Sequence, residues 1–341
     1  MKISIITPAR AGARNGNRNT ALRWARFLRE LRHRVIVEQQ WSGVRSDVMI
    51  ALHARRSFDS IRRYAEAFPT RPLVVVLTGT DVYRDIHADE HAKRSLELAT
   101  RLIVLQEMAA KELSSSLRGK TRVIYQSARK VERQAPLAGC FEVIVSGHLR
   151  TEKDPFRAAA AVAHLPGSSR IRITHVGGAL ESDMAAEARA WMAREPRYKW
   201  LGEVAHGRAL RILARARLMV ISSRLEGGAN VVSEALRSGV PVIASKVSGN
   251  VGMLGPRYPG YYPVGDERAL ARLLHRAECD RSFHALLTES CAARAPLIAP
   301  DRERAALDDL MSELQSPDTV NVRTLRGTVR ATPLLKTPLV R

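Results

Sequence analysis

The sequence has little cysteine and no long apolar run. Its three cysteines, Cys140, Cys279 and Cys291, have no metal-ligand spacing, so we expect no metal site and no disulfide framework, with thiols that stay reduced. No stretch approaches the roughly 18 consecutive apolar residues that a membrane helix needs. The short apolar run Lys2–Thr7 predicts a first β-strand, because a secretory signal needs a longer apolar segment. We therefore expect a cytoplasmic protein with no membrane partner.

Aromatic residues are also scarce, at 5% of the 341 residues. The formal net charge of +21, from 55 Lys and Arg against 34 Asp and Glu, is high enough to suggest a nucleic-acid partner. However, the basic residues are spread over the whole length, and few aromatic side chains are present to stack on bases. We expect instead a basic enzyme that acts on anionic small molecules and binds no nucleic acid.

Apolar runs alternate with amphipathic stretches along the whole chain. Strands are predicted over Lys2–Thr7, Arg34–Glu38, Val48–Leu52, Leu73–Leu77, Leu102–Leu105, Arg122–Tyr125, Phe141–Ser146, Arg170–Val176, Lys199–Leu201, Leu218–Ser222 and Val240–Ala244. Helices are predicted over Thr20–Arg32, Ser182–Arg194, His206–Ala214, Asn230–Ser238, Glu267–Ala277, Arg281–Ala293 and Arg302–Leu314. This alternation predicts right-handed βαβ units. The expected fold class is α/β, with two doubly wound, Rossmann-like domains facing a cleft.

Changes in composition predict the domain boundaries. The charged segment Ser127–Gly139 is typical of a linker, so we expect one domain over residues 1–130 and a second over residues 140–295. A helix within residues 296–315 could pack back on the first domain. Residues 316–341 are basic and lack helical periodicity, which predicts a flexible tail.

The most informative segment, residues 221–245, reads ISSRLEGGANVVSEALRSGVPVIAS. A strand end is followed by a polar loop with Glu226 and two glycines, and then by a helix that starts near Asn230 and carries Glu234. The glycines allow the backbone to approach a ligand closely, and the start of a helix capped by Asn230 suits a phosphate. We expect Glu226 to hold sugar hydroxyls and Glu234 to bind a ribose diol. Alternatively, Glu234 stabilises the helix dipole.

A second strand end, at residues 146–155 (SGHLRTEKDP), leads into a basic loop and the start of a helix. Its cationic candidates are His148, Arg150 and Lys153. A departing nucleoside diphosphate gains negative charge, and fixed cations lower the barrier to its departure. These residues therefore predict a site for an anionic leaving group.

Three segments of the N-terminal half also follow strand ends. Because ligands of open α/β sheets lie at the carboxyl ends of the strands, we expect these segments to line the same cleft. Residues 8–20, PARAGARNGNRNT, are rich in Arg and Asn and suit an anion, and residues 52–57 and 77–83 follow two further strands. The predicted acceptor-binding residues are Asn15, Gly16, Asn17, Arg18, Asn19, Thr20, His53, Thr78, Gly79, Thr80 and Asp81.

Two of these segments have alternative interpretations. His53 could be a general base, a positioning residue or a buried histidine with purely structural hydrogen bonds. Thr78, Thr80 and Asp81 could instead cap the turn that follows their strand.

The segment with Glu226 and Glu234 closely resembles the E-x7-E segment of family 4 glycosyltransferases of the GT-B fold. The match extends through Gly239–Ser245 and resumes at Tyr262–Asp266. The resemblance implies that Glu226 contacts the donor sugar, that the Gly228–Val232 backbone contacts sugar and diphosphate, and that Glu234 binds the ribose. The donor-binding residues that it implies are Gly147, His148, Gly227, Gly228, Ala229, Asn230, Val231, Val232 and Glu234.

Residues 146–155 resemble the G-R-L…E-K-G region of the same family, whose Arg and Lys neutralise the leaving diphosphate. Lys153 matches the family's lysine, whereas His148 stands where arginine is usual and Arg150 is the alternative for that role. The catalytic residues implied are Lys153, Arg150 and Glu226. Since GT-B relatives generally work without a bound metal, we expect no metal site and no tightly bound cofactor, with a UDP-sugar as co-substrate.

The N-terminal half carries the strings GNRNTALRWA, WSG, ALHARRS and LTGTDVY, which resemble the selenosugar synthases of selenoneine biosynthesis. This resemblance covers about residues 1–315. It implies transfer of a sugar, chiefly N-acetylglucosamine, from a UDP-sugar to selenophosphate, with a new carbon–selenium bond and loss of UDP and phosphate to give a 1-selenosugar. It also implies partner proteins of the selenoneine pathway. Since selenophosphate is already deprotonated at selenium, we expect His53 to position the acceptor.

Two other functions are compatible with the same motifs. The first is an ordinary family 4 glycosyltransferase that acts on a lipid or sugar hydroxyl, with its basic tail docked on an anionic membrane. The basic stretches Thr20–Arg32 and Ser57–Phe68 would then supply a surface helix for that membrane. The second is a nucleotide-sugar epimerase or a non-catalytic nucleotide-sugar sensor on the same fold.

Overall fold

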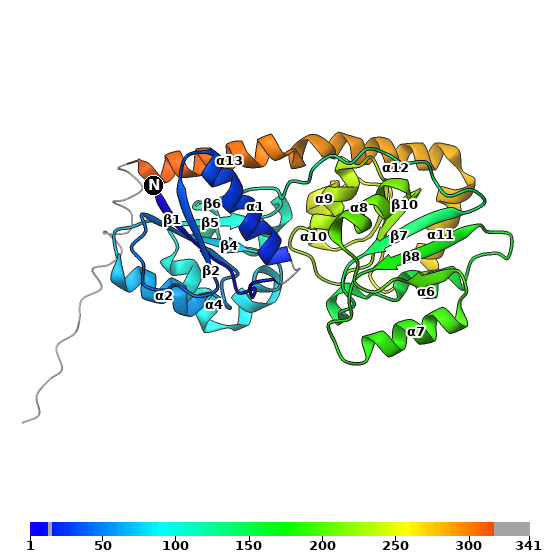
Figure 1. Ribbon diagram of the computed structural model, residues 1–341, viewed down its shortest axis with the longest axis horizontal. Coiled ribbons are helices and arrows are strands. Elements are labelled where there is room, and N and C mark those ends of the chain that lie inside the picture. The colour runs from blue at the N-terminus through cyan, green and yellow to red at the C-terminus, as the bar shows by residue number, and fades with distance from the viewer. Residues whose placement is uncertain (13–15, 317–341) are drawn as a thin grey trace, which may run out of the picture.

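The computed structural model describes residues 1–12 and 16–316. Within these residues the chain forms two parallel six-stranded sheets with helices packed against them (Figure 1). The strand order is β2-β1-β3-β4-β5-β6 in the first sheet and β12-β11-β10-β7-β8-β9 in the second. The predicted α/β fold with two Rossmann-like domains is confirmed. Asn15 and the part of the expected tail that follows Ser316 lie outside the described residues.

The elements follow one another in the expected strand–helix alternation. The first sheet consists of β1 (Lys2–Ile6), β2 (Arg34–Glu38), β3 (Val48–Leu52), β4 (Leu73–Leu77), β5 (Arg101–Val104) and β6 (Thr121–Val123). The second consists of β7 (Phe141–Ser146), β8 (Ile171–Val176), β9 (Tyr198–Trp200), β10 (Leu218–Ile221), β11 (Val242–Ser245) and β12 (Tyr261–Tyr262).

The helices are distributed over both halves. Those before the second sheet are α1 (Gly16–Glu30), α2 (Phe58–Ala67), α3 (Ile86–Ala88), α4 (Glu90–Leu98) and α5 (Ser115–Arg118). Those that follow are α6 (Arg157–Val162), α7 (Met184–Arg194), α8 (His206–Arg215), α9 (Asn230–Arg237), α10 (Ser248–Leu254), α11 (Glu267–Cys279), α12 (Arg281–Arg294) and α13 (Pro300–Gln315). The short turns η1 (Asp81–Asp85), η2 (Glu107–Glu112), η3 (Thr151–Lys153) and η4 (Ala295–Ile298) complete the set. None of the helices in residues 1–12 and 16–316 combines the length and the apolarity needed to cross a membrane.

Several elements differ from the prediction, among them β12 and α1. Strand β12 was not predicted, because two residues are too short to show a periodicity. Helix α1 begins at Gly16 and ends at Glu30, so the predicted range Thr20–Arg32 was wrong at both ends. The first turn of α1, residues 16–19, carries no apolar side chain, so the helical periodicity becomes visible only further along the chain.

Each sheet has its own apolar core, which fixes the ends of its strands. Strands β3 and β4 are buried at every position, as is usual when helices cover both faces of a parallel sheet. Helix α1 buries Trp24, Phe27 and Leu28 in the core of the first sheet. In the second sheet, Tyr198 and Tyr262 are among the largest fully buried side chains. The loops at the carboxyl ends of the strands therefore leave from a closely packed base.

The C-terminal helix α13 returns to the N-terminal half. Figure 1 shows α12 and α13 running along one side of both halves of the molecule. Leu307, Leu310, Met311 and Leu314 of α13 pack into the core of the first sheet. Pro300 occupies the first turn of α13, where its missing N–H group is not needed. The two halves are thus joined by α13 as well as by the segment between β6 and β7.

Candidate active site

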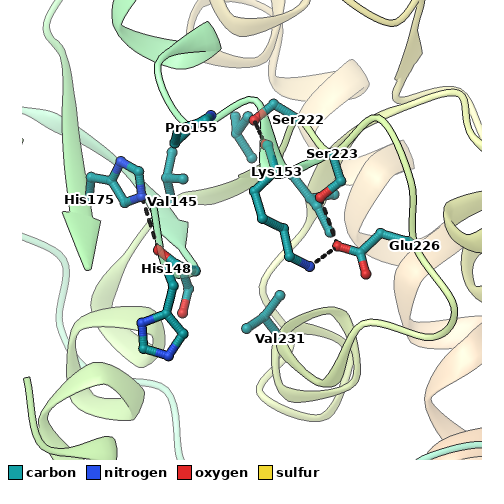
Figure 2. A pocket seen from close by; sticks show the side chains of 13 residues that line it. Val145, His148, Lys153, Pro155, His175, Ser222, Ser223, Glu226 and Val231 are labelled. Carbon is teal, nitrogen blue, oxygen red and sulfur yellow. Dashed lines mark hydrogen bonds and ion pairs between the residues drawn. The ribbon is translucent and has the colours of Figure 1, made fainter. Parts of the chain in front are cut away.

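A cavity lies at the switch point of the second sheet, where the chain leaves β7 and β10 (Figure 2). The residues that line it include Gly147, His148, Lys153, His175, Ser222, Ser223, Glu226 and Val231. Ligands of open α/β sheets bind beside the carboxyl ends of the strands at such a point. This position makes the cavity the candidate active site.

Lys153 and Glu226 form an ion pair at this cavity (Figure 2). The Lys153 Nζ donates to Glu226 Oε1, and the Ser223 hydroxyl donates to the same oxygen over 2.7 Å. The Glu226 side chain is 7% exposed and the Lys153 side chain 34% exposed, so the carboxylate is held in the wall and the ammonium group borders solvent. Such a pair offers an arriving ligand both a cation for a phosphate and an acceptor for hydroxyl groups.

The loop that carries Lys153 is held in place by the end of β10. The Ser222 hydroxyl donates to the carbonyl oxygens of Lys153 and Asp154 over 3.1 Å and 2.8 Å. Asp154 has a φ of +45°, which reverses the chain after η3, and its carboxylate pairs with Arg157 at 2.9 Å. These contacts fix the Lys153 backbone while leaving its ammonium group at the cavity.

His148 is the second cationic candidate that lines the cavity. The Gly178 N–H donates to His148 Nδ1 over 3.1 Å, which orients the ring. Arg150 instead pairs with Glu152 at 3.4 Å, and its side chain is 38% exposed. Of the two residues considered for the family's arginine, His148 is therefore the one that the fold brings to the cavity.

His175 supports this region and was missed by the sequence reasoning. Its Nε2 donates to the Gly147 carbonyl oxygen over 3.2 Å, and its Nδ1 accepts from the Tyr198 hydroxyl over 2.9 Å. Burial lowers the pKa of His175 to about 4, so the imidazole is neutral at physiological pH. His175 holds the carbonyl at the end of β7 in place. Its position inside an apolar strand, IRITHV, gives no sequence signal for this role.

The start of α9 differs from the prediction. Asn230 is the first residue of the helix and not its N-cap, which is Ala229, so the predicted cap was wrong. The Asn230 Oδ1 instead accepts from Arg23 Nη1 over 3.3 Å. Within the described part of the chain, no side chain caps α9. The first N–H groups of this helix are therefore suited to an anionic ligand, as expected for the donor side.

Glu234 lies in α9 beyond the cavity and is 17% exposed. Burial raises its pKa to about 7, an effect that the positive charge of Arg23 opposes. The His206 Nε2 lies 3.6 Å from the Glu234 carboxylate. The Glu234 carboxyl group is therefore close to half-ionised at neutral pH.

The two glycines before α9 contact the N-terminal half. A Cβ atom on Gly227 would lie 2.1 Å from the Thr78 carbonyl oxygen, and one on Gly228 would lie 2.8 Å from Leu105 Cβ. The Gly228 carbonyl oxygen accepts from Gln126 Nε2 over 2.7 Å. On the side where a Cβ would stand, these glycines therefore approach the other half of the protein, and their close approach to a ligand stays a prediction.

The acceptor candidates after β3 and β4 form one cluster. The Asp81 carboxylate, fully buried, accepts from the backbone N–H groups of Ala54, Thr78 and Gly79 over 2.7 to 3.1 Å. His53 has a φ of +72°, a strained conformation that tends to occur at functional sites.

The His53 ring is fixed within this cluster. The Arg56 N–H donates to its Nδ1 over 3.4 Å, so Nε2 carries the proton and donates to Thr80 Oγ1 over 3.1 Å. Burial lowers the pKa of His53, while Asp81 opposes this effect. The ring is therefore neutral near pH 7, with its basic nitrogen already engaged.

The other acceptor candidates lie in the first turn of α1. The Gly16 Cα faces the Asn230 side chain, since a Cβ there would lie 3.7 Å from Asn230 Nδ2. Asn17, Arg18 and Asn19 follow in the same turn, and all three are at least partly exposed. Thr20 is buried, and its hydroxyl donates within the protein to Gly16 O and Gln126 Oε1.

One group of side chains outside the cavity could hold a metal ion. In the described residues this group is His275, Glu278 and Cys279 of α11, whose ligand atoms lie within 4.8 Å of one another. Glu278 already accepts hydrogen bonds from the Ser169 hydroxyl and the Arg170 N–H. The prediction of no metal site depended on the spacing of the cysteines and on the resemblance to GT-B relatives, and neither considered this group.

Residues 126–301 match the family model described as glycosyl transferases group 1. The matched segment is just over half of the chain and contains both Lys153 and Glu226. The chain belongs to this glycosyltransferase family. A search of curated protein sequences gives no match.

Solved structures share the fold at low sequence identity. The Anabaena protein Alr3699/HepE, in complex with UDP and glucose, is 19% identical, with a TM-score of 0.73 over 92% of this chain and 100% of that chain. A sucrose-phosphate synthase from Thermosynechococcus elongatus is 17% identical, with a TM-score of 0.75 over 92% and 98% of the two chains. A glycosyltransferase from Rickettsia africae ESF-5 is 11% identical, with a TM-score of 0.72 over 93% and 99%. The fold is the GT-B fold of these proteins.

Proposed function

We propose that this chain transfers a sugar from a UDP-sugar bound in the cavity between β7 and β10. The observation that carries the proposal is the Lys153–Glu226 pair at that cavity, next to the start of α9, which no side chain in residues 1–12 and 16–316 caps. Alr3699/HepE has been solved with UDP and with UDP-glucose, which supports a UDP-sugar as the co-substrate.

The donor is proposed to bind along the loop and first turn of α9. The N–H groups of Gly227–Val232 and the loop at Gly147 contact the diphosphate and the sugar, while Glu226 accepts hydrogen bonds from sugar hydroxyls. Glu234 accepts from the ribose hydroxyls further along the helix. The donor must displace Lys153 from Glu226, which frees the ammonium group for the diphosphate.

Stabilisation of the leaving group is assigned to Lys153, with either Arg150 as a second cation or His148 as a hydrogen-bond donor through Nε2, since its Nδ1 accepts from Gly178. As the bond between the anomeric carbon and the diphosphate breaks, the departing UDP gains negative charge. Lys153 borders the cavity from a loop that Ser222 holds rigid, so its charge is in place before the reaction starts. The exchange of Glu226 for the diphosphate is complete once the donor has bound, so the cation needs no further reorganisation as the bond breaks.

The acceptor is proposed to be selenophosphate, bound between α1 and the cluster around His53. Selenium attacks the anomeric carbon, the carbon–oxygen bond to UDP breaks, and UDP leaves with the electron pair. Water then hydrolyses the selenium–phosphorus bond, which releases phosphate and the 1-selenosugar, and the sugar is proposed to be N-acetylglucosamine. Because selenophosphate needs no general base, a His53 whose basic nitrogen is engaged by Arg56 suits this acceptor.

The experiment is to incubate the purified protein with UDP-N-acetylglucosamine, with and without selenophosphate generated under anaerobic, reducing conditions. Mass spectrometry follows UDP release and any product with the isotope pattern of selenium. We expect both to depend on selenophosphate. The matched variants are Lys153→Met, which should lose turnover, and Lys199→Met on the exposed side of β9, which should keep it.

The other outcomes separate the alternatives. UDP release with a lipid or sugar hydroxyl, and none with selenophosphate, would support glycosyltransferase activity and exclude selenophosphate as the acceptor. Conversion of the donor without any acceptor would indicate an epimerase. Binding of UDP-sugar without turnover under every condition would indicate a sensor.

A further inference from the structure

Arg23 of α1 extends from the N-terminal half to the start of α9. Its Nη1 donates to Asn230 Oδ1 over 3.3 Å, and its Nη2 donates to Gln126 Oε1 over 3.0 Å. Its Nε donates to Glu303 Oε2 over 2.8 Å, and Nη2 also reaches Glu303 Oε1 at 3.2 Å. The side chain is 14% exposed. One guanidinium group thus joins α1, the segment after β6, α9 and α13.

Glu303 of α13 holds this guanidinium group in a fixed orientation. Its side chain is completely buried, and besides Arg23 it accepts from Trp24 Nε1 over 2.7 Å and from the Ser127 N–H over 2.9 Å. A buried carboxylate is stable only when it is paired and fully hydrogen-bonded. The two-point contact with the guanidinium fork also fixes the plane of Arg23.

Gln126 links Arg23 to Gly228, in the loop before α9. Its Oε1 accepts from Arg23 and from the Thr20 hydroxyl, which leaves Nε2 to donate to the Gly228 carbonyl oxygen over 2.7 Å. Its backbone carbonyl accepts from Ser233 of α9 over 2.7 Å. The start of α9 is therefore positioned from the N-terminal half at three points, on Gly228, Asn230 and Ser233.

Arg23 also acts on Glu234 through its charge. It is the cation that opposes the rise in the pKa of Glu234 caused by burial. His206 of α8 also faces Glu234, with its Nε2 at 3.6 Å from the carboxylate. Loss of the Arg23 charge should therefore shift ionisation of Glu234 to higher pH.

We propose that Arg23, held by Glu303, is a positioning residue of the donor site that orients the start of α9 and keeps Glu234 in the form that accepts hydrogen bonds from the nucleotide. Both Arg23 and Glu303 lie outside the segment 126–301 that matches the family. The inference rests on the proposed function, because it takes a nucleoside diphosphate as the ligand of α9.

The experiment measures the Kd of UDP by calorimetry between pH 6 and pH 9 for the full chain. All proteins carry His206→Gln, so that the histidine charge does not contribute. Arg23→Met should weaken UDP binding about tenfold at pH 7.5. It should also raise the pH below which UDP affinity falls, because Glu234 becomes protonated at higher pH without the Arg23 charge. Arg23→Lys keeps the charge but loses the fork, so it should weaken binding and leave the pH midpoint in place. Arg26→Met, one turn further along α1 on its exposed side, is the matched control and should bind as the parent does.

The outcomes distinguish the two proposals. If the parent protein binds no UDP, the proposed function fails. If it binds UDP and Arg23→Met matches it in both affinity and pH midpoint, the role of Arg23 is wrong. A purely structural role is tested by Arg23→Lys together with thermal unfolding. If both Arg23 variants lose stability and affinity together with an unchanged pH midpoint, the electrostatic action on Glu234 is rejected.

Discussion

A methyl group on Gly227 would lie 2.1 Å from the carbonyl oxygen of Thr78, well inside contact distance. Gly227 precedes the helix of the proposed donor site, and Thr78 follows β4 in the proposed acceptor region. Gly79, the residue after Thr78, also lies against the backbone of Gly227. The two halves of the protein therefore touch through backbone atoms where donor and acceptor are proposed to meet.

Gly227→Ala should lower the transfer rate by at least about tenfold, because the added methyl group forces the Thr78 backbone away and misplaces the two substrates. Steady-state rates and thermal unfolding measure the effect. The control is Gly207→Ala in α8, where the methyl group would lie 3.8 Å from the Arg211 side chain and alanine favours the helix. Full activity in Gly227→Ala would show that the contact has no part in transfer.

Glu234→Gln should stabilise the protein at alkaline pH. Folding raises the pKa of Glu234 from its ordinary value of 4.5 to about 7, so the folded state binds more protons and stability falls as pH rises between these values. At pH 8 the variant should be more stable by about 1 to 3 kcal/mol, and the difference should vanish near the ordinary pKa. Urea unfolding at several pH values measures this. A constant difference would contradict the pKa shift.

Arg18→Ala should raise the acceptor KM by about tenfold or more while leaving the Kd of UDP within about twofold, since Arg18 is assigned to the anionic acceptor. Kinetics at saturating donor and UDP calorimetry give the two quantities. Arg26→Ala on the same helix is the control. An equal loss of UDP affinity would show that the first turn of α1 serves the donor.

His53→Asn should keep the fold, because asparagine tolerates the positive φ of this position. Loss of the contact with Thr80 should raise the acceptor KM without removing a limb from the pH profile of kcat. The pH profiles of kcat for both proteins are the measurement. A limb that disappears in the variant would instead identify His53 as a general base.

Much of the fold could be predicted because the sequence pattern of most elements lies within a short stretch of consecutive residues. The buried runs of β3 and β4 and the amphipathic pattern of α11 are complete within a few residues each. Strand β12 and the first turn of α1 lack such a pattern and were missed or misplaced. Lys153 and Glu226 could be found because each lies in the loop that follows a strand end, in a segment of characteristic composition.

The contacts that complete the site could not be predicted in this way. Arg23 and Glu303 are 280 residues apart, and nothing local indicates that they form an ion pair. The same holds for Gln126, whose partners come from α1 and from the loop before α9. The predicted cap at Asn230 failed for this reason, because its side chain is engaged by a residue from the other half of the chain.

The most direct test of the central claim is the transfer rate of Lys153→Met at saturating UDP-N-acetylglucosamine and selenophosphate, beside Lys199→Met. We expect a fall in kcat of about 100-fold or more for Lys153→Met and an unchanged rate for Lys199→Met, because of these two lysines Lys153 borders the cavity where the leaving group gains charge. Equal rates in the two variants would contradict the assignment of this cavity as the site of transfer.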